Sequence, residues 1–74
     1  NRKEKSMTRR QSQIYFFIKR FINENNFSPS YQEMADGVGL KSKSGIHFLI
    51  DGLVKQGKVR RVKFTARSVE LVNG

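Results

Sequence analysis

Residues 42–56 read SKSGIHFLIDGLVKQ, and this stretch decides the fold. Its apolar residues recur at intervals of three and four, which is the period of a helix that buries one face. Ser42 is a good N-cap because its hydroxyl can accept a hydrogen bond from the first turn, and Gly57 is a good stop. The stretch therefore predicts a helix from about Ser42 to Gln56. Its apolar stripe consists of Ile46, Leu49, Ile50, Leu53 and Val54.

A first helix is predicted upstream, from about Arg9 to Asn25. Thr8 is followed three residues later by Gln11, which is the spacing of a capping box. Pro29 disfavours helical geometry for the residue before it, so the turn-forming residues 25–30 should end this helix. Apolar residues recur along the helix at three- and four-residue spacing, namely Ile14, Phe17, Ile18, Phe21 and Ile22.

A short second helix is predicted from about Tyr31 to Val38. Ser30 and Glu33 have capping-box spacing, and Gly39 can adopt the left-handed conformation that often ends a helix. The apolar face of this helix consists of Met34, Ala35 and Val38. Because only a few residues separate it from the stretch 42–56, a tight turn should join the two helices.

Two short runs near the end of the chain, Val59 to Phe64 and Arg67 to Leu71, suit a small antiparallel hairpin. Three helices followed by such a hairpin give the element order of a winged helix-turn-helix, a mostly α (α+β) fold. We expect this domain to span residues 7–74. Residues 1–6 hold no apolar side chain and are predicted to be a disordered basic arm or an expression remnant.

The length of the chain, 74 residues, allows one small core and no second domain. No cysteine is present, so disulfides and thiolate metal sites are excluded. Six Phe and two Tyr supply large buried area, so we expect an aromatic core. One histidine and six scattered acidic residues form no catalytic constellation, so we expect no enzyme, no cofactor and no small-molecule substrate.

The chain carries 15 Lys and Arg against 6 Asp and Glu, a formal net charge of +9. So large a positive charge on so small a domain attracts polyanions, and nucleic acid is the natural partner. A membrane surface is the alternative, but it requires a basic helix with an exposed apolar face, whereas the apolar stripes look internal. No run is long enough to span a membrane and no secretion signal follows the basic start, so a cytoplasmic location is expected.

In a helix-turn-helix, the N-terminal part of the second helix of the motif meets base edges in the major groove of DNA. A helical wheel places Ser44 and Phe48 opposite the apolar stripe, with Gly45 and His47 beside them. Asp51 and Lys55 share this face but lie farther from the bases. The predicted base-reading residues are Ser42, Lys43, Ser44, Gly45, His47 and Phe48.

Three of these residues have alternative roles. Phe48 could contact a thymine methyl, form part of a protein-facing patch, or lean onto the second helix. His47 could be exposed without a task, and no acidic or cysteine neighbour has the spacing that a metal site needs. Ser42 could serve as a cap alone. If Phe48 and nearby aromatics bind protein, the domain is a winged-helix interaction module and its charge serves solubility.

Basic residues around the motif are expected to contact phosphates and to set affinity rather than sequence preference. Arg9 and Arg10 sit in the first helical turn, where their charge opposes the helix dipole, so helix stability does not explain them. A solvated charged face is the alternative for the run in the hairpin. The predicted phosphate contacts are Arg9, Arg10, Lys41, Lys55, Arg60, Arg61, Lys63 and Arg67.

Several strings of residues occur together in this chain. They are Thr8-Arg9-Arg10-Gln11, Ser28-Pro29-Ser30 with Glu33-Met34, and Leu40-Lys41-Ser42-Lys43-Ser44-Gly45-Ile46-His47. Together they resemble the N-terminal domain of LexA repressors over about Met7 to Val72. The last string is the most specific, because it is similar to the recognition helix of one bacterial branch of that family. The wing of the same branch is similar to Gly57, Arg60-Arg61, Ala66-Arg67 and Val69-Glu70-Leu71.

The resemblance implies a winged helix-turn-helix that binds pseudo-palindromic operators as a homodimer and represses genes of the DNA-damage response. It also implies DNA-contacting positions at Ser42, Ser44, Gly45 and His47. In that branch an Arg commonly follows the His, whereas this chain has Phe48. Arg and Phe cannot read the same base edge, so the operator of the branch does not transfer to this chain.

LexA proteins also carry a C-terminal self-cleaving peptidase domain with a Ser-Lys dyad, and this domain dimerises. The chain ends at Gly74 without room for it, so we expect either an excised domain or a short relative. An isolated domain is expected to be a monomer in solution. Its binding to one half-site should be weak and strongly salt-dependent.

Overall fold

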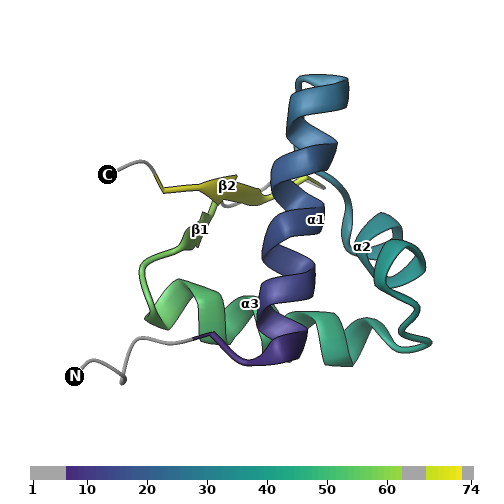
Figure 1. Cartoon of the computed structure of the whole chain (residues 1–74), viewed down its shortest axis with the longest axis vertical. Helices are drawn as coiled ribbons and strands as arrows, with labels where there is room; N and C mark the ends of the chain where they lie inside the picture. The colour runs from purple at the N-terminus through teal and green to yellow at the C-terminus, as the bar shows by residue number, and fades with distance from the viewer. Residues whose placement is uncertain (1–6, 63–66, 73–74) are drawn as a thin grey trace.

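The computed structural model describes residues 7–62 and 67–72 of the chain (Figure 1). The three helices and the antiparallel hairpin that follows them have the predicted order of a winged helix-turn-helix. We call the hairpin of β1 and β2 the wing. The predicted arm, residues 1–6, lies outside the described residues. The elements are α1 (Arg9–Asn25), α2 (Tyr31–Val38), α3 (Lys43–Lys55), β1 (Val59–Arg61) and β2 (Val69–Leu71).

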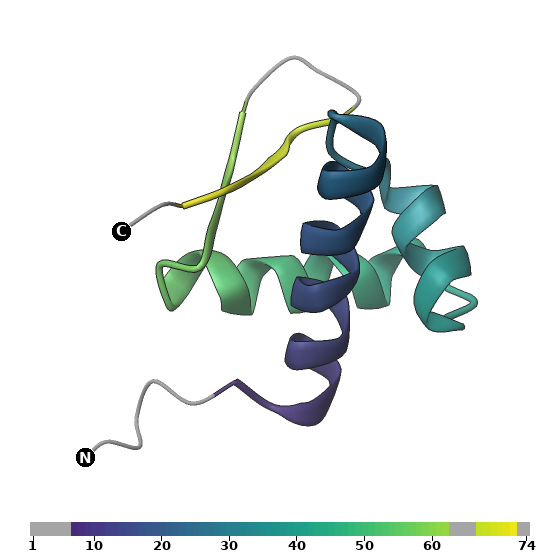
Figure 2. The ribbon, with the colours of Figure 1, turned by 45° about the horizontal axis from the view of Figure 1, so that its top comes forward.

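The third helix lies across the first one in both views of the ribbon (Figures 1 and 2). α2 lies near the N-terminal end of α3, and the wing rises from its C-terminal end. α3 packs against α1, α2 and β1. It therefore has one side toward the other elements and one side at the edge of the molecule.

Both predicted capping boxes are confirmed. At the start of α1 the Gln11 N–H donates to Thr8 Oγ1 at 3.1 Å, and the Thr8 N–H donates to Gln11 Oε1 at 2.9 Å. At the start of α2 the Glu33 N–H donates to Ser30 Oγ at 3.1 Å, and the Ser30 N–H donates to Glu33 Oε1 at 2.8 Å. Side chains thus satisfy backbone donors that have no partner within the helix, and both helices begin where predicted.

The ends of the helices use left-handed backbone conformations. Gly39 after α2 has φ +76 and Gly57 after α3 has φ +75, as expected for glycine stops. Asn26 is the C-cap of α1, with φ 66, and its N–H donates to the Ile22 carbonyl at 2.8 Å. Asparagine tolerates this conformation better than most residues, so α1 stops before Pro29 is reached.

The core is aliphatic, so the prediction of an aromatic core is wrong. Among the described residues the aromatic rings lie around the core: Phe17 and Tyr31 are half-buried against it, and Phe16 is 57% exposed. At the centre, where helix axes lie close together, compact side chains interdigitate better than rings. The buried hydrophobic residues are Ile14, Ile18, Met34, Ala35, Ile46, Leu49, Ile50, Leu53, Val59 and Val69.

The wing is attached to this core through Val59 and Val69, one buried residue from each strand. β1 and β2 pair in antiparallel register, with Arg60 opposite Glu70. The observed strands are shorter than predicted, and residues 63–66 lie outside the described part of the chain. β2 begins at Val69 rather than at Arg67, whose backbone carbonyl accepts a hydrogen bond from Ser28 Oγ at 3.1 Å.

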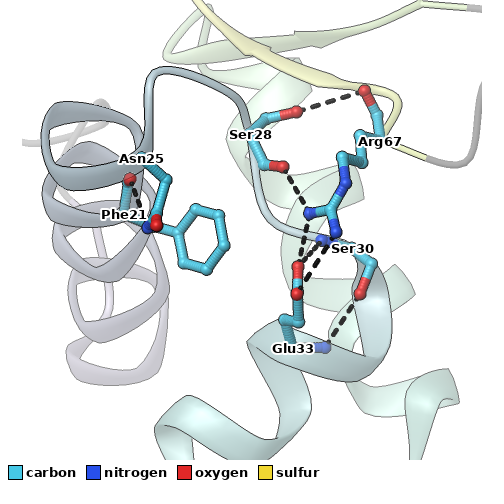
Figure 3. A network of polar contacts seen from close by, with 6 residues as sticks. All are labelled: Phe21, Asn25, Ser28, Ser30, Glu33 and Arg67. Atoms are coloured by element: carbon cyan, nitrogen blue, oxygen red, sulfur yellow. Dashed lines mark hydrogen bonds and ion pairs between the residues drawn. The ribbon is translucent and has the colours of Figure 1, made fainter.

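Arg67 ties the wing to the start of α2 (Figure 3). Its guanidinium donates to the Ser28 carbonyl at 2.9 Å and to the two carboxylate oxygens of Glu33 at 2.5 and 3.3 Å. It also lies 4.6 Å from the centre of the Phe27 ring. The hydrogen bond from Arg67, followed by the backbone hydrogen bond from Ser30, lowers the pKa of Glu33 from 4.5 to about 2.

This ion pair predicts a specific acid sensitivity. The pKa of Glu33 is lower in the folded chain, so its contribution to stability is complete above about pH 4.5 and is lost as the pH falls toward 2. Glu33→Gln keeps an oxygen that can accept the cap hydrogen bond but removes the titrating charge. Urea unfolding of both proteins at pH values from 7 to 2 should show a stability difference that shrinks over this window. A difference that stays constant would contradict the assignment.

A second prediction concerns the buried face of α3. Leu53 is 0% exposed, so Leu53→Ala removes packing that the surrounding side chains cannot fully restore. We expect a loss of about 2 to 5 kcal/mol in the free energy of unfolding, measured by chemical denaturation. Val54→Ala, at a half-buried neighbouring position, is the control and should cost less. Equal losses for the two variants would mean that Leu53 is not a central core residue.

Candidate nucleic-acid interface

The predicted base-reading residues lie together at the N-terminal end of α3 and in its cap. Ser42, Lys43, Ser44, His47 and Phe48 are exposed, and Gly45 is half-buried. Ser42 caps the helix, because its Oγ accepts from the Ser44 N–H at 3.1 Å. The backbone N–H groups of the first turn and these side chains therefore occupy one accessible surface.

Phe48 is the most exposed large apolar residue among those described, at 76%. The alternative in which its ring leans onto α2 is therefore wrong. A side chain with this exposure contributes little to the core, while the apolar stripe of α3 is already complete without it. The contact with a thymine methyl and the protein-facing patch are the two predicted roles that are compatible with this exposure.

Packing within the protein does not demand a glycine at position 45. A Cβ added there would meet only Leu40, at an ordinary 3.6 Å. Gly37 in α2 differs, because a Cβ there would lie 2.2 Å from the Phe17 ring. Gly37 therefore serves close packing of α2 against α1, whereas position 45 of α3 has room for a side chain.

His47 is held by a residue that the sequence analysis missed. The Tyr31 ring, at the start of α2, meets the imidazole edge to face with 4.2 Å between ring centroids and 71° between planes. The Tyr31 ring therefore lies against the imidazole, while His47 remains exposed to solvent. Tyr31 is the first residue of α2, and His47 lies 16 residues farther along in α3, so no local sequence pattern joins the two.

The three predicted wing arginines within the described residues are each paired with a carboxylate. Arg60 Nε lies 2.9 Å from Glu70 Oε1, across the strand pair. Arg67 is bound by Glu33, as described above. Arg61 is bound by the Asp51 carboxylate and by the Tyr31 hydroxyl. The hydrogen bond to Tyr31 first, and then the one to Asp51, raise the pKa of the Arg61 guanidinium.

The remaining predicted cations are distributed around α3. Arg10 donates to the Val38 carbonyl at 3.3 Å, which places it beside the turn between α2 and α3. Lys41 lies in that turn, and Lys55 is the last residue of α3; both are exposed, as is Arg9. Exposed cations therefore stand at both ends of the helix. Lys63 lies outside the described residues.

The described residues hold neither a cluster of metal ligands nor a membrane-spanning helix. No three His, Cys, Asp or Glu side chains come together as they would around a metal ion. In the same part of the chain, no helix has the length and apolar content needed to cross a membrane.

Comparisons with known proteins agree with this geometry. The chain is 42% identical to the LexA repressor of Pelagibacter ubique, 46% to that of Paramagnetospirillum magneticum and 44% to that of Cereibacter sphaeroides, each over 66 residues and 89% of this chain. It spans only 28 to 29% of the length of these relatives. Residues 4–68 match the family model of the LexA DNA binding domain. The chain belongs to the LexA DNA-binding domain family.

Proposed function

We propose that this chain binds duplex DNA in a sequence-specific manner, with the N-terminal part of α3 in the major groove. The observation that carries the proposal is the accessible surface formed by Ser42 to Phe48, on a helix whose other face is buried. A helix fits the major groove, where each base pair presents a distinct pattern of donors, acceptors and methyl groups. The side chains on this surface can address all three kinds of group.

The base-reading residues divide by chemistry. Ser44 and His47 exchange hydrogen bonds with base edges, and Lys43 reaches the acceptors of a guanine or a nearby phosphate. Gly45 lets the helix backbone approach the bases. Ser42 leaves further N–H groups of the first turn free for a phosphate, which the helix dipole also favours.

Cations around α3 hold the domain on the DNA backbone without reading sequence. Arg10 and Lys41 flank the N-terminal end of α3, while Lys55 and Arg60 lie toward the wing. Arg9 is a further exposed cation, and Lys63, which lies outside the described residues, remains a predicted phosphate contact. Arg61 and Arg67 also contribute positive charge, although both guanidinium groups bind carboxylates of the domain itself.

The relatives are LexA repressors, and on this basis we propose a role in transcriptional repression in bacterial cytoplasm. The operators of a LexA-type repressor would be pseudo-palindromic sites of the DNA-damage response, bound by two copies of the chain. One domain supplies about half of the contacts of such a dimer, so it binds a single half-site weakly and with strong salt dependence.

The test is selection of bound duplexes from a random pool, followed by titration of the selected duplex and a scrambled one at two salt concentrations. The proposal expects one enriched half-site and an affinity that falls steeply with salt. Absence of binding even at low salt would reject a DNA-binding role and favour the winged-helix protein-interaction module. Binding without enrichment of any sequence would reject base reading by α3.

A third prediction concerns Phe48. The only apolar group on the major-groove edge of the bases is the thymine methyl, so we expect the ring to contact one. Replacing that thymine by uracil deletes a single methyl and should weaken binding about 4-fold, from ~0.8 kcal/mol per buried carbon group. Phe48→Ala should bind the thymine and uracil duplexes equally. If no thymine of the selected half-site responds to this replacement, Phe48 does not read a methyl.

A fourth prediction separates base contacts from phosphate contacts. Ser44→Ala and His47→Ala should relax base preference and leave the salt dependence nearly unchanged. Lys41→Met should instead weaken binding to all sequences alike and reduce the slope of log affinity against log salt by about 0.9. Titrations over a range of salt concentrations measure both quantities. A change of base preference in Lys41→Met would show that this division is incorrect.

A further inference from the structure

Arg61 belongs to the wing, yet its guanidinium lies between the two helices of the helix-turn-helix. Its Nε–H donates to Tyr31 Oη at 3.1 Å, and Nη1 donates to the Asp51 carboxylate. Nη2 donates to the backbone carbonyl of His47 at 3.3 Å. A guanidinium has five N–H donors in a rigid plane, and Arg61 uses donors on all three of its nitrogens within the protein.

The contacts of Arg61 meet at His47. Tyr31 accepts the hydrogen bond from Arg61 with its hydroxyl, while its ring lies against the imidazole at 4.2 Å between centroids. Arg61 also contacts His47 directly, because its Nη2 donates to the His47 carbonyl. Both the main chain and the ring of His47 are thus fixed by groups that the guanidinium orients.

Arg61 also neutralises the charge of Asp51. Asp51 lies one helical turn after His47 on the outer face of α3, where an isolated carboxylate would repel DNA phosphates. The ion pair with Arg61 offsets this negative charge. The same pair leaves Arg61 little net charge to offer a phosphate.

We propose that Arg61 and Tyr31 are positioning residues that hold His47 in the orientation in which it reads its base. In this role Arg61 sets base preference without contacting DNA, which replaces the expectation that it binds a phosphate. The inference rests on the proposed DNA-binding function. Arg60, the neighbouring residue, provides the contrast: its side chain is 69% exposed and pairs with Glu70 within the wing.

The decisive variant is Arg61→Lys. It keeps the positive charge and still suits a phosphate, but a single ammonium cannot reproduce the planar fork that joins Tyr31, Asp51 and His47. We expect discrimination at the base read by His47 to fall about fivefold or more, with affinity for scrambled duplex unchanged. Arg60→Lys is the matched control and should keep the wild-type preference.

A second variant tests the same arrangement from the other side. Tyr31→Phe removes only the hydroxyl that accepts from Arg61 and keeps the ring. Tyr31→Phe should reduce discrimination at the same base. The double variant Arg61→Lys/Tyr31→Phe should lose little more discrimination than either single variant, because both changes disrupt the same arrangement of Arg61, Tyr31 and His47. Additive losses, or losses at a different base, would overturn the proposal.

The position of the imidazole can be measured without DNA. His47 is the only histidine of the chain, so its ring protons can be recognised in a proton NMR spectrum. The nearby Tyr31 ring displaces these signals from the values of a free histidine. Arg61→Lys and Tyr31→Phe should shift them toward those values, and Arg60→Lys should not.

The outcomes separate the two proposals. If the wild-type domain selects no duplex while the His47 signals respond as expected, the DNA-binding function fails and the positioning of His47 stands. If the wild type selects a half-site and Arg61→Lys retains full base preference, the DNA-binding function stands and the positioning role of Arg61 is overturned. Unchanged His47 signals in both variants would also overturn it.

Discussion

The burial of one face of α3 is the constraint on which the rest of the structure depends. Ile46, Ile50 and Leu53 are completely buried, and the helix that carries them packs against α1, α2 and β1. Side chains on a helix are separated by a fixed rotation of about 100° per residue, so burying this stripe also fixes the direction of every outer side chain. Ser44 and Phe48 are therefore aimed at solvent by the core itself. The core and the candidate interface thus lie on opposite faces of the same helix, α3.

The helix bounds could be predicted because capping acts between residues close in the sequence, whereas contacts between distant residues could not be predicted. A capping box acts over three residues, as between Ser30 and Glu33, so it can be recognised in the letters. The contact between Arg67 and Glu33 joins residues 34 apart. An arginine in a sequence shows its charge but not its partner, and the wing arginines were for that reason predicted as phosphate contacts. The prediction of an aromatic core failed for a similar reason, because the size of a ring does not show where in the fold it will lie.

The pairing of the wing arginines changes how the positive charge of the domain is distributed. Glu33, Asp51 and Glu70 each hold one of them, so the wing is less positive than its sequence indicates. These pairs are largely exposed and contribute modestly to stability. Arg67 joins the wing to α2 and Arg61 joins it to α3, whereas the pair of Arg60 and Glu70 lies within the wing. The exposed cations near the ends of α3 then account for more of the attraction to a polyanion. The wing arginines thus bind carboxylates of the domain, and under the proposed function the exposed cations around α3 attract the DNA.

Phe48 shows how such a scaffold can change its target without changing its fold. The ring takes no part in the core, so the residue at this position is free to vary at little cost in stability. On the major-groove edge a phenyl group can gain only from a thymine methyl, whereas a guanidinium there gains most from guanine acceptors. Because Ile46 and Ile50 hold the backbone in either case, we expect a substitution at position 48 to change the preferred base and to leave the neighbouring side chains in place. The buried face of α3 holds the fold together, and under the proposed function its outer face selects the DNA sequence.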